Sequence, residues 1–467
     1  MRKLQLVAFL LLSLIVSSCS QEKAESKPNI VIINVDDMGW KDVGYMGSGY
    51  YETPNIDALS KLGKVFTNGY AASANCAPSR ASLMTGKWTT RHNIYTVGSS
   101  ERGKSKNRKL IPIKNTTVLA HTHITISEVL KEKGYTTIHA GKWHISKDPL
   151  RYGFDINIGG ANNGHPRSYY PPYKNVTLEA GKKTQLTDAI MEKTIAHIAT
   201  VKQPFFLNYA PYAVHTPIQP IKSLLTKYEH KKASNGQNNA GYATMIENLD
   251  TNIGLLIEAL KTAGKLDNTL LVFTSDNGGL FGITNQHPLR AGKGSYYEGG
   301  IREPFFFVWK NKIKASTTSD IPITNMDLFP TLLEAAGINL TQHKLDGNSI
   351  LPVLKEETNI LERPLFWHFP IYLQAYKVKN NENRDPLFRT RPGSVVRVGD
   401  WKLHYYFENN ELELYNLASD IGEKNNIAEQ NKEKTAELLL LLKNWWKETN
   451  APIPTQLNPE FKSTKEA

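Results

Sequence analysis

Cysteine is scarce in this chain, because only Cys19 and Cys76 occur among its 467 residues. If Cys19 is modified as its surroundings predict below, Cys76 has no partner in the chain and an intrachain disulfide is excluded. Long low-complexity tracts are also missing, and a composition of 40% hydrophobic and 21% charged residues is that of a globular protein. The length suffices for one large domain and a smaller one. Cys76 must therefore be retained for a purpose other than cross-linking.

A recognised nucleic-acid motif is likewise absent, and the lysines and arginines are scattered along the chain. We therefore exclude nucleic acid as a partner. The formal net charge of +12 still suits an anionic partner of another kind. Charge alone says little about chemistry, so the partner has to be inferred from motifs.

The N-terminus carries an apolar segment, residues 4–16, behind a basic start. The segment is too short for a permanent membrane-spanning helix, and residues 1–18 predict a secretory signal. Small residues precede Cys19, as in a bacterial lipoprotein signal, where the cysteine is lipid-modified and becomes the new N-terminus. Residues 19–27 would then tether an exported protein to a membrane, expected to be the outer membrane. Ordinary secretion, with Cys19 lost or left free, is the alternative.

The stretch Cys76-Ala77-Pro78-Ser79-Arg80 is the centre of the sequence pattern. Pro78 suits the first turn of a helix, since its missing N–H would have no partner there. Cys76 would lie just before that helix, where free N–H groups favour an anion, and Arg80 adds a fixed positive charge. This predicts a reactive residue in an anion-binding site. A buried structural cysteine is the alternative.

Oxygen-bearing side chains follow two strands of the buried type. Residues 28–35 form one apolar run that ends at Asp36 and Asp37, and residues 269–274 form another that leads to Asp276 and Asn277. Ligands of open α/β sheets bind beyond the carboxyl ends of strands. An all-oxygen set suits Ca²⁺ or Mg²⁺ rather than zinc. A solvated turn with capping aspartates is the alternative.

Further candidates follow other predicted strands. Lys142 and His144 stand two residues apart after the strand 135–139, on what we expect to be an extended segment that points both side chains the same way. His215 follows the strand 204–209. The remaining candidates lie in loops, where Lys293 is a further donor to an anion, and His165 and Arg167 are in the surface loop 153–173 and are candidate substrate contacts.

From about residue 360 the pattern changes to short strands alternating with turns, which predicts an antiparallel sheet. A long helix over 432–448 completes a smaller C-terminal subdomain. From this subdomain His368 and Arg391 are candidates to reach the main site and contact substrate, although a structural role is equally compatible with the sequence.

These pieces together resemble the formylglycine-dependent sulfatases of the alkaline phosphatase superfamily. The family signature Cys-x-Pro-Ser-Arg followed by Thr-Gly is present from Cys76 to Gly86, and the other motifs extend the resemblance over nearly all of the mature chain. The resemblance implies an α/β fold with a large mixed, mostly parallel sheet flanked by helices and a smaller C-terminal subdomain of antiparallel sheet plus helix. We place the catalytic domain at 28–358 and the subdomain at 359–467.

The resemblance also implies the chemistry. A maturation enzyme would oxidise Cys76 to formylglycine, whose hydrate attacks sulfur beside Ca²⁺ or Mg²⁺. Sulfate oxygens would be held by three cations: Arg80, Lys142 and Lys293. His215, or Lys293 with it, would protonate the leaving oxygen, and His144 would accept a proton when sulfate is expelled. The implied metal ligands are Asp36, Asp37, Cys76 in its modified form, Asp276 and Asn277.

We expect the substrate to be sulfated carbohydrate, with algal ulvan, carrageenan or fucan first and host glycosaminoglycans second. Loops 99–116, 153–173 and 372–397 would set the position that is attacked. Three alternatives remain open at this point. The first alternative is a phosphate or phosphonate ester hydrolase of the same superfamily, and the second is a non-catalytic glycan-binding lipoprotein. The third is an enzyme that uses Cys76 as a thiolate.

Overall fold

The computed structural model describes residues 27–357, 363–378 and 382–462. Within them the chain forms a large sheet, a smaller sheet of four strands and a two-stranded ribbon. The strands of the large sheet are β1 (Asn29–Val35), β2 (Lys64–Tyr70), β3 (Thr136–Gly141), β4 (Ile156–Ile158), β5 (Phe205–Ala210), β6 (Thr269–Ser275), β7 (Arg302–Val308), β8 (Thr317–Ser319) and β9 (Ile323–Thr324). The four-stranded sheet has β10 (Leu365–Phe369), β13 (Gly393–Val398), β14 (Trp401–Tyr406) and β15 (Glu411–Asn416), and the ribbon has β11 (Leu373–Gln374) and β12 (Phe388–Thr390).

The helices connect and cover these strands. The α-helices are α1 (Pro54–Ser60), α2 (Cys76–Thr85), α3 (Thr89–His92), α4 (Ile126–Glu132), α5 (Leu186–Thr200), α6 (Lys222–Glu229), α7 (Ala240–Thr262), α8 (Glu298–Ile301), α9 (Leu328–Ala335), α10 (Leu351–Leu354) and α11 (Lys432–Thr449). Short 3₁₀ turns are η1 (Gly44–Met46), η2 (Ser105–Asn107), η3 (Pro149–Tyr152), η4 (Leu266–Asn268) and η5 (Asn325–Asp327). No helix among the described residues is long and apolar enough to cross a bilayer.

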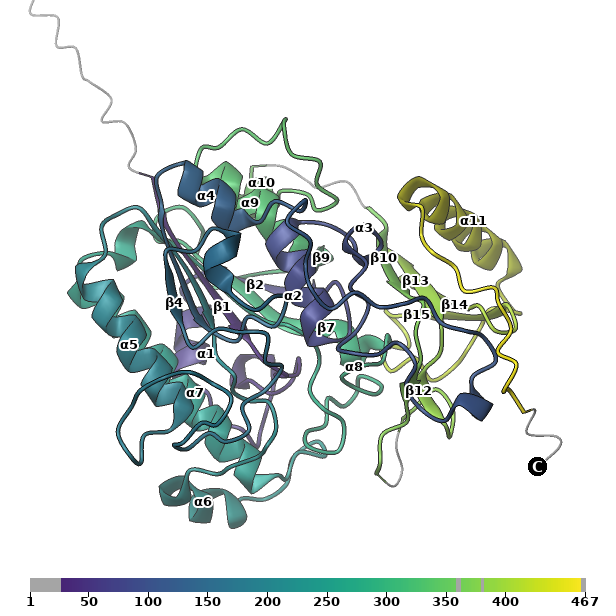
Figure 1. Ribbon diagram of the computed structural model, residues 1–467, viewed down its shortest axis with the longest axis horizontal. Helices are drawn as coiled ribbons and strands as arrows, with labels where there is room; N and C mark the ends of the chain where they lie inside the picture. Colours follow the sequence, from purple (N-terminus) through teal and green to yellow (C-terminus); the bar gives the residue numbers. More distant parts are fainter. Residues whose placement is uncertain (1–26, 358–362, 379–381, 463–467) are drawn as a thin grey trace, which may run out of the picture.

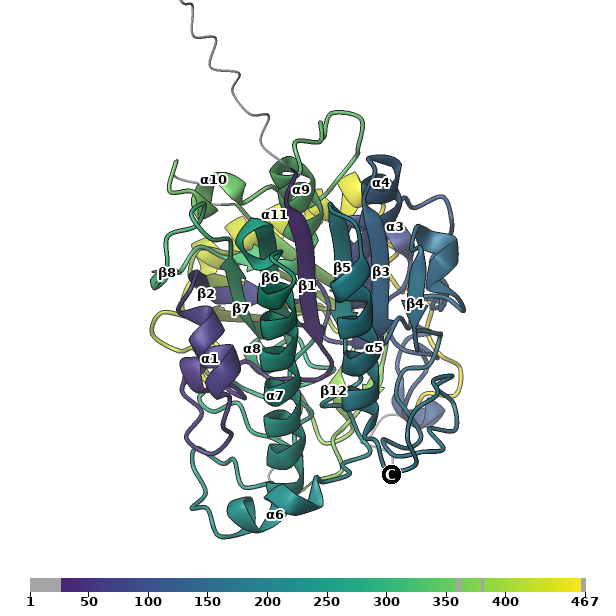
Figure 2. The ribbon, with the colours of Figure 1, turned by 90° about the vertical axis from the view of Figure 1, so that its left-hand side faces the viewer.

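The large sheet has the order β4-β3-β5-β1-β6-β7-β2-β8, with β9 paired to β2. Strand β7 runs antiparallel to β6 and β2, and the other pairings in this sheet are parallel. The sheet is therefore mixed and mostly parallel, which confirms the predicted fold class. Helices α1, α5 and α7 cover one face and α2, α4 and α9 the other (Figures 1 and 2).

Strand β1 shows why the sheet is buried on both faces. Val31 and Ile33 belong to the core on the α7 side, whereas Ile30 and Ile32 belong to the core on the α2 side. All four side chains are fully buried. Each contributes about 1.5–3 kcal/mol of hydrophobic stabilisation. The continuous apolar run in the sequence is thus explained by helices on both sides of the strand.

The smaller sheet, in the order β10-β13-β14-β15, packs between the main body and α11 (Figure 1). Val396 and Trp446 share one core under α11, while Val395 belongs to another with Tyr70 of the large sheet. A buried ion-pair network joins the two parts as well, because Lys402 Nζ lies 2.8 Å from Glu298 Oε1. The predicted antiparallel subdomain is present, and its helix ends one residue later than predicted.

Two local expectations are corrected. The loop 153–173 is not wholly irregular, since β4 lies within it and pairs with β3. The segment after β3 is not extended either, because Gly141 and His144 have φ values of 104° and 69°. The signal, Cys19 and the tether lie outside the described residues except for the last tether position. The predicted boundary between 358 and 359 lies outside them too and stays a prediction.

Candidate active site

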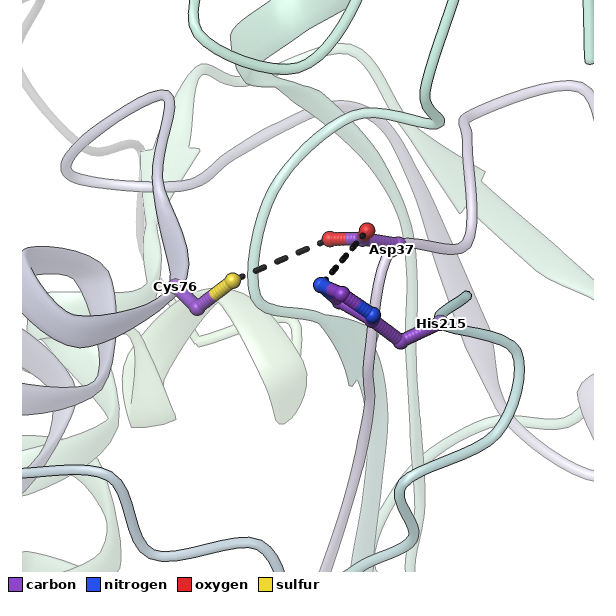
Figure 3. A group of neighbouring side chains, drawn as sticks. All are labelled: Asp37, Cys76 and His215. Atoms are coloured by element: carbon purple, nitrogen blue, oxygen red, sulfur yellow. Dashed lines mark hydrogen bonds and ion pairs between the residues drawn. The ribbon is translucent and has the colours of Figure 1, made fainter. Parts of the chain in front are cut away.

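The site lies where β1 and β6 end beside the start of α2. The carboxyl ends of the two strands are joined directly, because the Asp276 N–H donates to the Val35 carbonyl and the Asp37 N–H to the Asp276 carboxylate. Cys76 faces this edge, with its sulfur 3.8 Å from Asp37 Oδ1 (Figure 3). The two acidic motifs, 240 residues apart in the sequence, thus meet at one place, as the strand-end argument predicted.

Helix α2 holds Cys76 rigidly at its first position. Asn75 before it is extended, and the helix ends at Gly86, whose φ of 63° is the left-handed conformation common at helix ends. All ten residues of α2 are buried, and Cys76 is only 1% exposed. The Ser79 hydroxyl accepts a hydrogen bond from Asn325 Nδ2 at 2.8 Å, which fixes the first turn against η5. Cys76 begins the helix rather than preceding it.

Four oxygen-bearing side chains and Cys76 converge at the strand ends. One atom each from Asp36, Asp37, Asp276 and Cys76 lies within 4.8 Å of the others. Asn277 joins this group through Nδ2, which donates to Asp37 Oδ1 at 2.8 Å. Its carbonyl oxygen, Oδ1, is buried and has no hydrogen-bond partner among the described residues. A buried acceptor without a donor beside three carboxylates fits a hard divalent cation.

The carboxylates repel one another, and their pKa values diverge. Burial raises the pKa of Asp36 to about 8 although Lys142 opposes the shift, and Asp276 and Asp37 add to the rise. Burial also acts to raise the pKa of Asp37, but Lys293 and His215 outweigh it and hold that pKa below its usual range. Crowded buried acids of this kind are stabilised as anions by a shared cation.

Three cations balance the three acids. Lys142 Nζ donates to both oxygens of Asp36 at 2.7 Å, and Arg80 Nε donates to Asp276 at 2.7 Å. These two cations stand behind the site and do not line the cavity in front of Cys76. The expected contact of Arg80 and Lys142 with a sulfate ester stays a prediction, and Arg80 Nη2 has no hydrogen-bond partner among the described residues.

Lys293 is the cation that reaches the reactive position. Its Nζ lies 2.6 Å from Asp37 Oδ1 and 3.1 Å from the Cys76 sulfur. Burial acts against its charge, but Asp37 and Cys76 raise its pKa above the ordinary value. Burial also raises the pKa of the Cys76 thiol to about 12, although Lys142 and Lys293 oppose this. A raised pKa favours the neutral thiol over the thiolate that the alternative of a cysteine nucleophile requires.

Three histidines lie around the cavity. His215 Nε2 is 3.5 Å from Asp37 Oδ2 (Figure 3), and its Nδ1 donates to the Thr216 carbonyl at 2.7 Å, which fixes the tautomer. His165 stacks on His215, with ring centroids 5.4 Å apart. His144 is 92% buried, and its Nδ1 has no hydrogen-bond partner among the described residues. All three of these predicted residues are thus brought together.

The cavity in front of Cys76 has a volume of about 270 Å³. Its walls combine the predicted residues with groups that sequence reasoning did not single out. The lining residues that sequence reasoning did not single out are Asn75, Val97, Arg102, Gly164, Leu280, Leu373 and Arg389. Arg102 and Arg389 stand in two of the loops expected to set specificity, but nothing in their local sequence distinguishes them from the other arginines there.

Three predicted substrate contacts are not brought to this cavity. Both ring nitrogens of His368 have partners in the protein, Ser394 Oγ at 2.8 Å and the Pro452 carbonyl at 3.1 Å. Arg391 pairs with Asp385 and Glu408 beside a separate surface pocket. Arg167 is exposed and does not line the cavity. His368 and Arg391 therefore have structural roles, because the ring nitrogens of His368 are hydrogen-bonded within the protein and the guanidinium group of Arg391 is ion-paired within it.

The site residues lie in a segment that matches a known family model. The sulfatase model matches residues 28–338, and the model of the C-terminal region of N-sulphoglucosamine sulphohydrolase matches 292–450. A protein named sulfatase from Formosa agariphila is 34% identical, with 96% of this chain and 94% of that protein covered. The chain is a member of the sulfatase family.

Other relatives agree with this assignment. Human N-acetylgalactosamine-6-sulfatase is 30% identical, with 74% of this sulfatase and 69% of the human protein covered. Among solved structures, Ps i-CgsB in complex with k-i-k-neocarrahexaose matches with a TM-score of 0.73 and 30% identity, covering 94% of this chain and 96% of that one. The fold is that of the alkaline phosphatase-like sulfatases, and the protein is an enzyme that hydrolyses sulfate esters.

Proposed function

We propose that this sulfatase removes sulfate esters from sulfated carbohydrate, using a formylglycine made from Cys76. One observation carries the proposal: Cys76 stands at the start of a buried helix, at the floor of an open cavity, between Lys293 and three carboxylates. The similarity to Ps i-CgsB, whose complex contains a carrageenan-type oligosaccharide, supports carbohydrate as the substrate class. We expect algal sulfated polysaccharide fragments first.

The modification explains why a cysteine stands in an oxygen-rich site. A thiol is a poor ligand for a hard cation, whereas a hydrated aldehyde at position 76 supplies an oxygen nucleophile. A thiosulfate adduct on Cys76 has no internal route for release. With a diol, the second hydroxyl loses a proton as sulfate leaves, and the aldehyde forms again.

The residues also fit the divalent cation that the family generally uses. Asp36, Asp37, Asp276 and Asn277 would hold it, as Ca²⁺ or Mg²⁺, together with the modified residue 76. When bound, such a cation favours the deprotonated form of a neighbouring hydroxyl and offsets negative charge on sulfate. The three acids are already matched by Arg80, Lys142 and Lys293, so the cation leaves the site with net positive charge for an anionic ester.

The chain's own groups divide the remaining work. Lys293 is placed to hold a sulfate oxygen in front of Cys76, since its Nζ lies 3.1 Å from the sulfur. His215 is oriented by Thr216 and lines the cavity, but the proton of its neutral ring is on Nδ1, and burial and Lys293 lower its pKa to about 3. To act as the acid, this ring must therefore take up a second proton at Nε2 before it gives one to the leaving oxygen, and the ammonium of Lys293 is the second candidate. The unpartnered His144 Nδ1 supports the proposal that this ring takes a proton when sulfate is released, although burial and then Lys142 hold its pKa well below the usual range in the protein without bound sulfate.

The proposal is tested by measuring sulfate release from defined ulvan, carrageenan and fucan oligosaccharides and from glycosaminoglycan fragments. Mass spectrometry of the Cys76 peptide from the same sample should show formylglycine, and Cys76→Ser should abolish release. An aryl phosphate ester serves as the rival substrate. A strong preference for the phosphate, or an unmodified thiol in active enzyme, would contradict the proposal.

We also propose that the protein is an exported lipoprotein anchored through Cys19, at the outer membrane. The basic start, the short apolar segment and the small residues before Cys19 support this. Incorporation of labelled fatty acid should be seen in the wild type and lost in Cys19→Ala. Equal recovery of both proteins in the membrane fraction, without label, would contradict the anchor.

A further inference from the structure

Two arginines, Arg102 and Arg389, line the cavity in front of Cys76 in addition to the site residues described above. Arg102 comes from the loop after α3, and Arg389 is the middle residue of β12 in the C-terminal part. Both residues are half-buried. They approach the same space from segments that are almost 290 residues apart in the sequence, so their meeting is a product of the tertiary fold.

Their two segments are held against each other by several contacts. The Tyr372 N–H donates to the Ser100 carbonyl at 3.0 Å, and Glu101 forms an isolated β-bridge with Tyr372. A side chain at Gly103 would stand 2.7 Å from the ring of Phe388, which shows how closely the loop packs on β12. The position of Arg102 relative to Arg389 is therefore set by the backbone and does not depend on a flexible loop end.

The hydrogen bonds of both guanidinium groups orient them without neutralising them. Arg389 donates from Nε to the Gln374 carbonyl and from Nη1 to the Lys293 carbonyl, each at 2.9 Å, and it lies over the ring of Tyr376. Arg102 donates from Nη2 to the Val97 carbonyl at 2.6 Å. Among the described residues neither has a carboxylate partner.

Neighbouring arginines provide the contrast. Arg391, two residues from Arg389, is paired with Asp385 and Glu408, and Arg384 is paired with Glu411. Arg391 and Arg384, which do not line the cavity, thus have carboxylate partners, whereas Arg102 and Arg389, which line it, have none in the part of the chain that the structure describes. Burial lowers the pKa of Arg102, and the positive charge of Arg389 lowers it further, so the two groups repel each other. Fixed cations that repel in a cavity form an anion-binding site.

We propose that Arg102 and Arg389 form a second oxyanion subsite, which binds another sulfate ester or a carboxylate on the same oligosaccharide while the first ester lies at Cys76. This rests on the proposed function and narrows it, since the preferred substrate carries at least two negative groups. Planar guanidinium donors recognise the oxygens of a sulfate or carboxylate with defined geometry.

The test is equilibrium binding to full-length protein carrying Cys76→Ser, so that no ligand is consumed. The probes are a neocarrabiose with two sulfate esters, one with a single ester, and a monosulfated disaccharide with a uronate. We expect the two dianionic probes to bind at least about tenfold more tightly than the monosulfated one. Adding Arg389→Gln or Arg102→Gln should remove most of this preference, and Arg151→Gln, at an exposed arginine, should keep it.

The outcomes separate this inference from the proposed function. Preference for the second sulfate or for the uronate supports the subsite and identifies its ligand. Equal binding of the three probes, or a preference that survives both arginine substitutions, overturns it. Unaltered melting temperatures of the variants exclude misfolding as the cause. If the binding preference holds but wild-type protein releases no sulfate from the disulfated probe, the subsite stands and only the proposed function fails.

Discussion

Cys76 lies 3.1 Å from the Lys293 ammonium and is surrounded by carboxylates. Most side chains in this site contact more than one neighbour. His215 illustrates this, because it touches Asp37 through Nε2 and the Thr216 carbonyl through Nδ1. A substitution there alters both proton transfer and charge balance. The role of His215 in proton transfer therefore has to be separated from its role in charge balance, and varying the substrate does this.

His215→Gln should slow the reaction most for substrates with poor leaving groups. A sugar alkoxide needs a proton as the ester bond breaks, whereas an activated aryl oxide does not. We expect kcat/KM to fall by about 10²–10³-fold on a sulfated oligosaccharide and by much less on an activated aryl sulfate. A series of aryl sulfates of rising leaving-group pKa measures this.

The control for this prediction is His230→Gln, at an exposed histidine outside the cavity. It should leave the dependence on leaving group unchanged. An equal loss for every leaving group with His215→Gln would show that the ring only positions substrate, and Lys293 would then be the proton donor.

Asn277→Leu should weaken binding of the divalent cation without removing a charge. The substitution deletes the buried Oδ1 that lacks a partner, and it also frees Asp37 Oδ1 from one hydrogen bond. We expect at least a tenfold rise in the Kd for Ca²⁺ and a smaller rise in melting temperature when Ca²⁺ is added. Calorimetry and thermal unfolding after chelation measure both quantities.

Asn444→Leu, at an exposed position on α11, is the matched control and should keep the affinity of the wild type. A wild-type protein that shows no stabilisation by Ca²⁺ or by Mg²⁺ would contradict the assignment of these oxygens as a cation site.

At the scale of elements, the end of β3 turns sharply to place Lys142 and His144. Gly141 has a φ of 104°, and a Cβ there would lie 2.0 Å from the Ala210 carbonyl oxygen of β5. Only glycine avoids this contact, since the obstructing atom belongs to the backbone and cannot rotate away. The turn therefore depends on the close approach of two adjacent strands.

Gly141→Ala should lower the free energy of unfolding by about 3 kcal/mol or more, combining backbone strain with the clash. Gly134→Ala is the matched control, because its φ is 89° but nothing lies within 4 Å of the added Cβ. It should cost only about 1–2 kcal/mol. Urea unfolding of both variants measures the difference. Equal losses would show that the contact with Ala210 is relieved by a small backbone shift.

The elements that sequence reasoning predicted best are those with a continuous pattern. The apolar run of β1 and the Pro78 signal of α2 both specify local structure, and each leads directly to a site residue. The bend after β3 was missed, because Gly141 and His144, both residue types that adopt a positive φ more readily than most, were interpreted only as parts of an extended segment. Strand β4 was missed because its three residues stand in a segment rich in turn formers.

The site was predictable to the extent that its residues end strands or begin helices. The pairing of Lys142 with Asp36 and the placement of Arg389 were not predictable, because they depend on which elements become neighbours in space. The same reason applies to His368, whose imidazole is taken up by Ser394 and the Pro452 carbonyl.

For the whole molecule, buried neutral histidines make stability depend on pH. Burial lowers the pKa of His92 and of His139 from 6.5 to about 3, and that of His368 to about 4. Below the unfolded-state value of 6.5 the unfolded chain binds protons that the folded chain does not, so the free energy of unfolding falls as pH falls. Each histidine contributes about 1 kcal/mol of this loss between about pH 6.5 and pH 5.5.

Urea unfolding across this range should therefore show a loss of about 3 kcal/mol from these three groups. His368→Gln should reduce the loss by about 1 kcal/mol, since an amide can still donate to the Pro452 carbonyl. His230→Gln, at an exposed ring, should not. A stability that is flat over this interval would show that the buried rings are already charged in the folded state.

The enclosure of α2 has a consequence for how active protein is produced. Cys76 is 1% exposed and every residue of its helix is buried. A separate enzyme therefore cannot bind this segment once the fold is complete. Under the proposed function, Cys76 must therefore be converted to formylglycine before folding is complete, and a chain that folds first keeps its thiol. Overproduction without enough maturation enzyme should then give two populations that melt alike and differ in mass at residue 76, and only the population with formylglycine should release sulfate.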